Sequence, residues 1–538
     1  FNKEVSDLTL AECTVLASIT SNPSRYNPIT NPENNNTRRQ IVLQNMVDQN
    51  YISKQDMENA LSDDVYDRIQ NVNTATKETN SHYSYFTDEL IEQVTEALMK
   101  KLGYTESQAS NLVYSGGLKI YTTQDPKIQA IVDEEVNDPG NYTVAKYSVE
   151  YRLSVNQADG TTQHYSEENL RAYRKNPLGD TSFEGLYNSK EEVQADIDRY
   201  KEWLLKDGDD VIAERQNLIL QPQASFFIMD QHTGEVKALS GGRGEKTASR
   251  TLNRATNVYR QPGSSFKVLT AFAPAIDTCG ATLGTVYYDA PYTIGTKTFR
   301  NWWGESRGFT GYSNIREGII YSMNIVAVRT LMETVTPQLG VEYAENLGIT
   351  SLTKDDLGAA LSLGGITKGV SNMELTAAYA AIANGGVYTT PRFFTKILDH
   401  DGKVLIDNEP ETKQVLKDST AFLLTDAMSE SMKANRKFAR SGVSINSTST
   451  RAALTGMSAA GKSGTTTSNN DVWFVGFTPY YTAGVWGGCD NNQKLKHGGV
   501  DNGGTSFHKD IWRNIMNRVH EGLEDPAFTV PDSVETAE

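Results

Sequence analysis

A serine and a lysine stand one helical turn apart in the segment VYRQPGSSFKVLTAFAPAID, at Ser264 and Lys267. Residues three apart share one face of a helix, so a neutral Lys267 amine could accept the hydroxyl proton of Ser264 and make it a nucleophile. A helix-capping serine beside a solvated lysine gives the same spacing. The segment SLTK repeats the pattern at Ser351 and Lys354, so S-x-x-K alone does not assign a function.

Two later motifs add a second serine, a carboxamide and a second lysine. Ser322 and Asn324 form S-x-N in YSMN, and the run GKSGTTTS contains Lys462. The residues around Lys462 favour a strand over a helix. The S-x-N pattern is common by itself, because it also begins at Ser154, Ser444 and Ser468. All three motifs in this order are hard to obtain by accident.

Taken together, the motifs resemble those of the penicillin-binding transpeptidases, in the acyl-serine group that also contains β-lactamases. The segments NRATNVYRQPGSSFK, GVSNMELTAAYAAIANGGVYTTP and DVWFVGFTP share the resemblance, which extends from about residue 220 to 515. The segments LTLAECTVLASITSNPSRYNP and RRQIVLQNMVDQNYIS resemble the last part of the glycosyltransferase domain of the class A, bifunctional members. The resemblance places that domain's catalytic glutamates upstream of any segment present, so glycosyltransferase activity is not expected.

The resemblance implies a role for each residue of the first two motifs. Ser264 would attack the carbonyl between two D-alanines, and Lys267, kept neutral by desolvation or by the charge of Lys462, would take its proton. The identity of the base stays open, as it does for the related β-lactamases. Ser322 would pass a proton to the leaving amine, and Asn324 would hydrogen-bond the substrate's peptide amide.

The third motif is expected to form one wall of the cleft. Lys462 and Thr465 would hold the terminal carboxylate of the substrate, a charge that β-lactam antibiotics mimic. Side chains alternate along a strand, so Ser463, Thr465 and Thr467 are predicted to share one face. Gly464 would allow a close backbone approach. The backbone N–H groups of the nucleophile and of Thr465 would form the oxyanion hole.

The pattern of elements predicts an α+β fold, with an antiparallel sheet flanked by helices. The segment ASFFIMDQHTGEVKALSGG has the pattern of a β-hairpin, and DVWFVGFTP and YYTAGVWGG have that of late strands, so first and last strands are expected to pair. Residues 140–215 are polar and Tyr-rich, with one clear helix in SKEEVQADIDRYKEWLLKDG. The predicted boundaries are 1–75 for a glycosyltransferase remnant, 76–219 for a small mixed linker or accessory subdomain, 220–515 for the transpeptidase domain and 516–538 for an acidic tail.

A phosphate-binding loop is a competing interpretation from another class of protein. The segment GMSAAGKS fits G-x-x-x-x-G-K-[ST], and FFIMD ends at Asp230 like a magnesium-binding strand. That loop requires a helix beginning at Lys462, whereas the residues that follow, GTTTSNND, are poor helix formers.

Composition narrows the class of partner. The chain has 67 Asp and Glu against 51 Lys and Arg, a net charge of −16, which argues against nucleic acid. The three cysteines, far apart, favour neither disulfides nor a metal site, and no cofactor is expected. No apolar run is long enough to span a bilayer. We expect a fragment of a longer protein that has an upstream membrane anchor and lies on the extracytoplasmic face of a bacterial membrane.

The predicted function is a serine D,D-transpeptidase that cross-links peptidoglycan stem peptides through an acyl-enzyme on Ser264 and is inhibited covalently by β-lactams. Its partners would be stem peptides ending in D-Ala-D-Ala and the acceptor amine of a neighbouring stem, with divisome or elongation-complex proteins as further candidates. A D,D-carboxypeptidase, a β-lactamase and an inactive antibiotic sensor could use the same residues.

Overall fold

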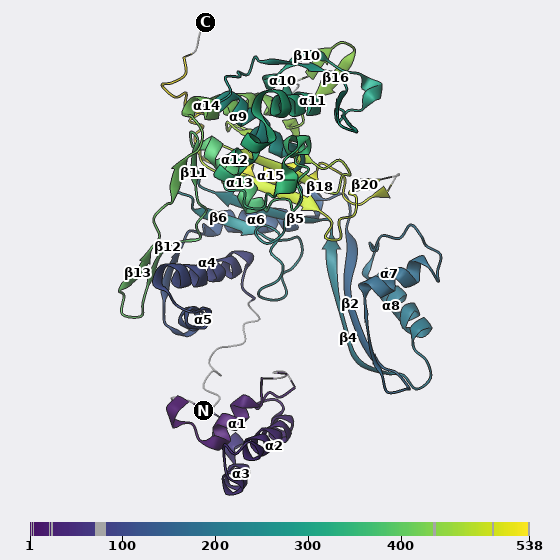
Figure 1. Cartoon of the computed structure of the whole chain (residues 1–538), viewed down its shortest axis with the longest axis vertical. Coiled ribbons are helices and arrows are strands. Elements are labelled where there is room, and N and C mark those ends of the chain that lie inside the picture. The colour runs from purple at the N-terminus through teal and green to yellow at the C-terminus, as the bar shows by residue number, and fades with distance from the viewer. Residues whose placement is uncertain are drawn as a thin grey trace. The chain divides into compact units, whose positions relative to one another are not determined.

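The computed structural model describes the chain except residues 2, 4, 21, 23, 24, 70–81, 434–436, 498, 499 and 536–538. It forms two compact units, Phe1–Ser81 and His82–Glu538 (Figure 1). The predicted boundary between residues 75 and 76 lies outside the described residues, and the other predicted boundaries stay predictions. Among the described helices, none combines the length and apolar character that a membrane crossing requires.

The described residues of the smaller unit form the α-helices α1 Leu10–Ala17, α2 Pro32–Asp48 and α3 Lys54–Leu61. The third helix begins with a capping box, in which Ser53 and Asp56 exchange hydrogen bonds. Glu12 is buried on α1, where it caps the helix and accepts hydrogen bonds from Lys3 and Arg68. These hydrogen bonds give Glu12 a structural role.

A five-stranded antiparallel sheet in the order β17-β18-β19-β5-β6 lies at the centre of the larger unit. Its strands are β5 Gln223–Met229, β6 Val236–Ser240, β17 Ala460–Thr465, β18 Asp471–Phe477 and β19 Thr482–Gly488. Thr482 pairs with Met229 and Gly488 with Gln223. The prediction that the first and last strands of this domain pair is therefore confirmed.

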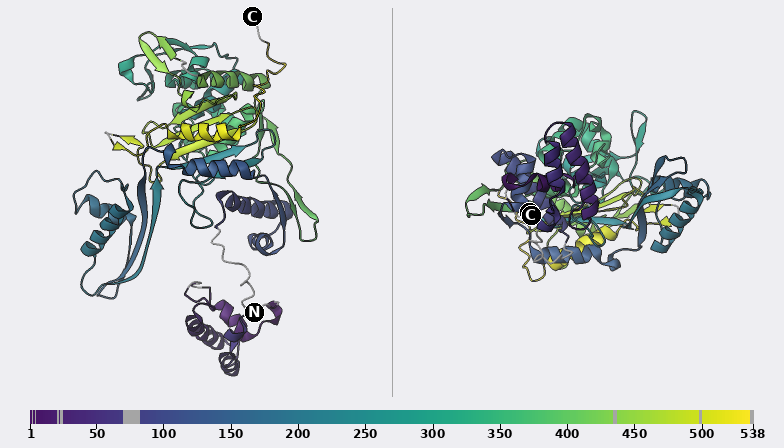
Figure 2. Two further views of the ribbon diagram at one scale, coloured as in Figure 1. Left: turned by 180° about the vertical axis from the view of Figure 1, so that it is seen from behind. Right: turned by 90° about the horizontal axis from the view of Figure 1, so that it is seen from below.

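Helices cover both faces of this sheet (Figures 1 and 2). Side chains alternate along β18, so Trp473 and Val475 enter the core that contains α13 Asn372–Ala383 and α14 Asp418–Met432. Val472 and Phe474 enter the opposite core with α6 Pro126–Asn137 and α15 Phe507–Val519. The central strands are buried on both sides, which explains why their sequences are nearly continuous apolar runs.

Outside the Tyr-rich region, the other described α-helices of the larger unit are α4 Tyr85–Leu102, α5 Glu106–Ser115, α9 Ala273–Asp277, α10 Ile315–Ile320, α11 Asn324–Arg329 and α12 Pro337–Asn346. A second sheet pairs β1 Lys119–Thr122, β12 Phe394–Leu398 and β13 Val404–Asp407. Two-stranded pairs are β7 Val286–Asp289 with β10 Gly311–Asn314, β8 Tyr292–Ile294 with β9 Lys297–Phe299, β11 Val387–Thr389 with β14 Thr412–Gln414, β15 Lys437–Arg440 with β16 Val443–Asn446, and β20 Lys496–His497 with β21 Val500–Asp501.

The Tyr-rich region contains more structure than its sequence indicated. Its elements are β2 Lys146–Asn156, β3 Thr162–Ser166, α7 Glu167–Lys175, α8 Lys190–Leu204 and β4 Asp210–Gln221, with strand order β3-β2-β4. Only α8 was predicted. Most of β4 is exposed, so its sequence has no apolar alternation that would mark a strand.

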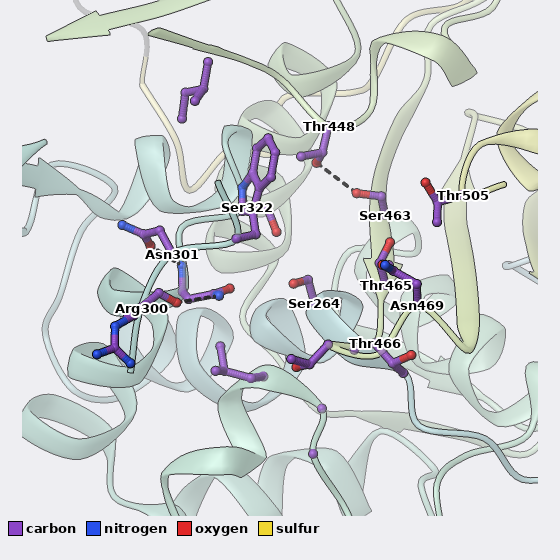
Figure 3. A pocket seen from close by; sticks show the side chains of 18 of the residues that line it. Ser264, Arg300, Asn301, Ser322, Thr448, Ser463, Thr465, Thr466, Asn469 and Thr505 are labelled. Carbon is purple, nitrogen blue, oxygen red and sulfur yellow. Dashed lines mark hydrogen bonds between the residues drawn. The ribbon is translucent and has the colours of Figure 1, made fainter. Parts of the chain in front are cut away.

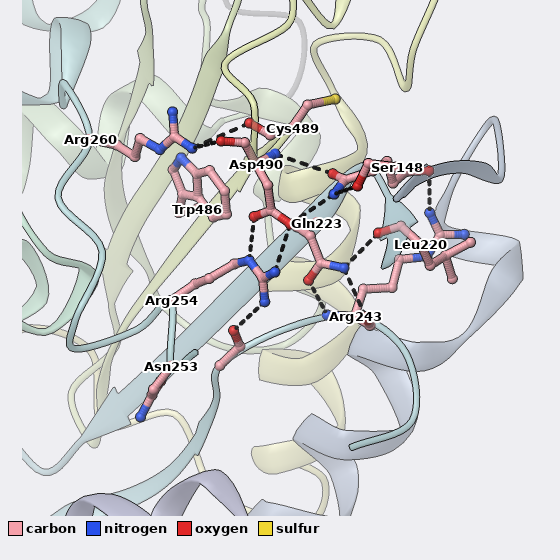
Figure 4. A network of polar contacts seen from close by, with 12 residues as sticks. Ser148, Leu220, Gln223, Arg243, Asn253, Arg254, Arg260, Trp486, Cys489 and Asp490 are labelled. Carbon is pink, nitrogen blue, oxygen red and sulfur yellow. Dashed lines mark hydrogen bonds and ion pairs between the residues drawn. The ribbon is translucent and has the colours of Figure 1, made fainter. Parts of the chain in front are cut away.

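A polar network joins the base of this region to the central sheet (Figure 4). Arg254 forms a bidentate pair with Asp490, at 2.6 and 2.7 Å, just beyond the end of β19. Gln221, the last residue of β4, donates to Asp490 and to the Ser148 hydroxyl. The Arg254 side chain is only 7% exposed, so water solvates its charge poorly. The Asp490 carboxylate compensates that charge instead.

Candidate active site

Glycines let the turn that contains Ser264 lie against the central sheet. Gly263 has φ +55°, and a Cβ there would lie 2.6 Å from the Thr465 carbonyl oxygen. A Cβ on Gly464 would lie 2.2 Å from the Pro262 carbonyl oxygen. The turn and β17 therefore touch through backbone atoms, as predicted for Gly464, and this contact places Ser264 beside Thr465 (Figure 3).

The Lys267 amine is buried beneath the cleft and joins the first motif to the second. Its Nζ lies 2.6 Å from the Ser322 carbonyl oxygen, 2.7 Å from Asn324 Oδ1 and 3.3 Å from Ser322 Oγ. Burial, and then the charge of Lys462, hold the pKa of Lys267 well below its ordinary value. The two carbonyl acceptors match the two N–H groups of a neutral amine, which leaves its lone pair available for a proton.

Lys462 approaches Ser322 from β17. Its fully buried Nζ donates to Ser322 Oγ at 2.8 Å and to the Ser463 carbonyl oxygen at 3.0 Å. Burial, and then the charge of Lys509, lower the pKa of Lys462 to about 7. Ser322 has φ +55°, a conformation uncommon for a residue with a side chain, and its hydroxyl lies between the two lysine amines. The hydroxyl can thus exchange protons with either amine.

The side chain of Ser264 is half-buried and points into the cleft (Figure 3). Within the part of the chain that the structure describes, its hydroxyl has no hydrogen-bond partner. The direct bond from Ser264 to Lys267 that proton transfer requires is absent, because the amine is bonded to Ser322 and Asn324 instead. Ser264 and Ser322 line the same cleft, and the two amines of lowered pKa contact Ser322.

These side chains surround a cleft of about 990 Å³. Six of the nine predicted site residues line it, namely Ser264, Ser322, Asn324, Ser463, Thr465 and Thr467. Lys267 and Lys462 lie behind this lining and reach the cleft through Ser322. The structure therefore brings the three motifs together.

The predicted position of Thr467 is wrong in one respect. β17 ends at Thr465, and Thr467 is an exposed turn residue, so strand alternation does not place it on the face of Ser463. The Thr466 hydroxyl accepts from the backbone N–H groups of Asn470 and Asp471, which closes a turn instead of extending the strand. Thr467 reaches the cleft from that turn.

The segment RNWWG contributes residues to the cleft that the three motifs did not predict. Trp302 is 48% exposed on the cleft wall, whereas Trp303 is packed in the core. Asn324 donates its backbone N–H to Asn301 Oδ1 and its Nδ2 to the Arg300 carbonyl oxygen. Neighbouring residues thus hold the carboxamide of the second motif in place, an arrangement with no signal in the local sequence.

The phosphate-loop interpretation is excluded. Lys462 and Ser463 lie inside a β-strand, paired with Val475 and Phe474, so no helix N-terminus follows the glycine-rich segment. A phosphate-binding loop requires that helix.

Comparison with known proteins agrees with this geometry. The family described as "Penicillin binding protein transpeptidase domain" matches residues 224–517, and the family "Transglycosylase" matches residues 1–47. The chain belongs to the penicillin-binding protein transpeptidase family. It is 32% identical to penicillin-binding protein 1A of Clostridium botulinum over all of the chain, and 28% identical to that of Aquifex aeolicus over 99% of the chain.

The chain covers 56% of the Clostridium botulinum protein and 69% of the Aquifex aeolicus protein, so it spans little more than half the length of the first. Among solved structures, Haemophilus influenzae penicillin-binding protein 1A has a TM-score of 0.58 at 20% identity, covering 98% of this chain and 83% of that one. The PonA1 protein of Mycobacterium tuberculosis, solved with penicillin V, has a TM-score of 0.56 at 22% identity, covering 83% and 96%. These similarities show the fold and confirm the predicted class A resemblance, with a short transglycosylase remnant.

Proposed function

We propose that this penicillin-binding protein acts as a serine D,D-transpeptidase that joins stem peptides through an acyl-enzyme on Ser264. One observation carries the proposal: two buried lysines of lowered pKa, Lys267 and Lys462, meet at the hydroxyl of Ser322, in a cleft where the hydroxyl of Ser264 is unengaged. Amines with lowered pKa can move protons near neutral pH, which is what activation of a serine requires.

In this mechanism the Ser264 oxygen attacks the carbonyl between the two terminal D-alanines, and its proton passes to the neutral Lys267. The backbone N–H groups of Ser264 and Thr465 stabilise the oxyanion, at about 3 kcal/mol for each donor. The C–N bond then breaks. The Ser322 hydroxyl gives its proton to the leaving D-alanine amine and takes a proton from Lys462 in return. An acceptor amine then attacks the resulting ester and loses a proton through Ser322 to Lys462, while Lys267 returns its proton to the Ser264 oxygen as the ester bond breaks.

Asn324 is suited to orient the substrate. Its Oδ1 accepts from Lys267 and one Nδ2 hydrogen is donated to the Arg300 carbonyl oxygen, so the second Nδ2 hydrogen is fixed in direction. We assign that hydrogen to the carbonyl oxygen of the donor peptide. Along β17, the substrate backbone would pair as an added strand, since β17 is the edge strand of the sheet.

The proposal extends to inhibition and location. β-Lactams present a strained amide and a carboxylate in the place of D-Ala-D-Ala, so they should acylate Ser264 and leave slowly. Peptidoglycan is built outside the cytoplasm, so we place this domain at the extracytoplasmic face of a bacterial membrane, attached through the parent protein. Proteins of the cell-division or elongation machinery are candidate partners for that parent.

The test offers the chain a stem peptide ending in D-Ala-D-Ala, with and without an amine acceptor, and identifies the products by mass. A transpeptidase forms the new amide at the expense of hydrolysis, and Ser264→Ala forms neither product. Hydrolysis alone at saturating amine would instead indicate a D,D-carboxypeptidase. Turnover of penicillin within seconds would indicate a β-lactamase.

A further inference from the structure

The buried position of Lys462 raises the question of which cation meets the substrate carboxylate. The Lys462 side chain is 0% exposed, and its amine donates to Ser322 Oγ and to the Ser463 carbonyl oxygen. It does not line the cleft. A substrate carboxylate on the cleft surface is therefore separated from this amine by the residues that line the cleft.

Lys509 offers a second amine on the same side of the cleft. It lies in the first turn of α15 and lines the cleft together with Thr505 and Ser506, which precede that helix. Its ammonium has neither a hydrogen bond nor an ion pair with any residue that the structure describes. Figure 3 places Thr505 beside Ser463 and Thr465, so this wall meets the end of β17.

The charges around Lys509 leave it uncompensated. The neighbouring carboxylate of Asp510 is shared by Arg451 and Arg513, at 2.5 and 3.0 Å. Burial, and then the charge of Arg451, lower the pKa of Lys509 to about 8, so the amine stays mostly protonated at neutral pH. Two basic groups face it, Arg451 and Lys462, and one acidic group, Asp510.

All the charged residues that line the cleft are basic, although the chain carries a net charge of −16. Its charged lining residues are Lys297, Arg300, Arg307, Arg451 and Lys509, with no aspartate or glutamate among the described lining residues. Such a lining attracts an anionic substrate. Close to Lys509, the hydroxyls of Thr465 and Thr505 also have no partner in the described part of the chain, so three unused donors occupy one end of the cleft.

We propose that Lys509 supplies the positive charge that binds the terminal carboxylate of the acyl donor, with the hydroxyls of Thr465 and Thr505 as further donors. Lys462 then serves the proton chemistry at Ser322 and not the carboxylate. The inference deepens the proposed function, on which it rests, by adding a specificity-determining residue outside the three motifs. A carboxylate bound by one ammonium and two hydroxyls has the charge-assisted contacts that give the strongest recognition.

The experiment compares the second-order rate of Ser264 acylation by benzylpenicillin with that by its methyl ester, which lacks the carboxylate. The variants of the whole chain are Lys509→Met, Lys509→Arg and, as a matched removal of one lysine from the cleft wall, Lys297→Met. Lys509→Met should lower the rate with the acid about 10- to 100-fold and the rate with the ester less than about threefold, the loss expected for a hydrogen bond to a charged group.

Lys509→Arg should recover most of the rate with the acid. Lys297→Met removes only a share of the long-range attraction of the cleft lining, so it should change the acid-to-ester ratio less than about threefold. An equal loss with acid and ester in Lys509→Met would overturn the inference, because it would mean that Lys509 acts on the chemistry at Ser264. An unchanged ratio would overturn it as well. If the wild-type chain is not acylated by benzylpenicillin at all, the proposed function itself fails, which separates the two outcomes.

Discussion

Replacing Lys462 with methionine should change how the stability of the larger unit depends on pH. The folded chain holds this amine with a pKa of about 7, whereas unfolding returns it to its ordinary value of 10.5. Between these values the unfolded chain binds a proton that the folded chain does not bind. The free energy of unfolding of the wild type therefore rises with pH across this window.

The size of the effect follows from that difference. One proton contributes about 1.4 kcal/mol for each pH unit. Between about pH 7.5 and pH 9.5 Lys462 therefore adds about 2.5 kcal/mol to the free energy of unfolding, slightly less than two full units because the folded amine is still partly protonated at pH 7.5. Lys462→Met removes this gain. The variant also loses the hydrogen bonds from Lys462 to Ser322 and Ser463. This loss lowers its free energy of unfolding by the same amount at every pH, so it does not change how that free energy varies with pH. The charge of Lys462 also helps to lower the pKa of Lys267. In Lys462→Met the pKa of Lys267 therefore rises, which also weakens the dependence of stability on pH.

Urea unfolding followed by tryptophan fluorescence measures this difference. All six tryptophans lie between residues 203 and 512, so the signal reports the larger unit alone. The expected result is that the free energy of unfolding of the wild type minus that of Lys462→Met rises by about 2.5 kcal/mol from pH 7.5 to pH 9.5. Lys297→Met, which removes an exposed lysine, serves as the control. Parallel pH dependences of wild type and Lys462→Met would refute the account of a buried amine with a lowered pKa.

Two further substitutions test the framework around the site. Gly464→Ala places a Cβ 2.2 Å from the Pro262 carbonyl oxygen, so the turn that contains the nucleophile must move and acylation by penicillin should fall at least about tenfold. Gly358→Ala, where a Cβ meets nothing within 4 Å, should leave that rate unchanged, and equal rates for both variants would contradict the packing argument. Asp490→Asn should destabilise the larger unit by about 3 kcal/mol in urea unfolding, because it leaves the nearly buried Arg254 without its carboxylate; a change below about 1 kcal/mol would show that the pair contributes little.

The sequence was sufficient to predict the core of this fold, because its signals there are local. The central strands are apolar runs ended by turn residues, and the hairpin of β5 and β6 contains a Thr-Gly turn at Thr233 and Gly234. The order of the three motifs then indicated which distant segments meet. The motifs predicted a direct contact between Ser264 and Lys267, whereas the structure brings the amines of Lys267 and Lys462 together at the Ser322 hydroxyl.

Other features depend on tertiary packing that no local pattern encodes. β4 is exposed over most of its length, so it lacks the apolar alternation by which strands are recognised, whereas its partner β2 has that alternation from Val149 to Val155 and was missed. Thr467 continues a β-favouring run, yet the Thr466 hydroxyl closes a turn there. Lys509 resembles any lysine near the start of a helix. Only the packing of α15 against β18 and β19 reveals that Lys509 faces the cleft.

Whether Ser264 is the nucleophile is tested most directly by mapping its adduct. The chain is incubated with labelled benzylpenicillin and digested, and the labelled peptide is identified by mass. We expect a lasting adduct on Ser264 that is lost in Ser264→Ala and kept in Ser351→Ala. Ser351 has the same S-x-x-K spacing, but its hydroxyl donates to the Gly369 carbonyl oxygen. An adduct that persists in Ser264→Ala, or that maps to another residue, would contradict this expectation.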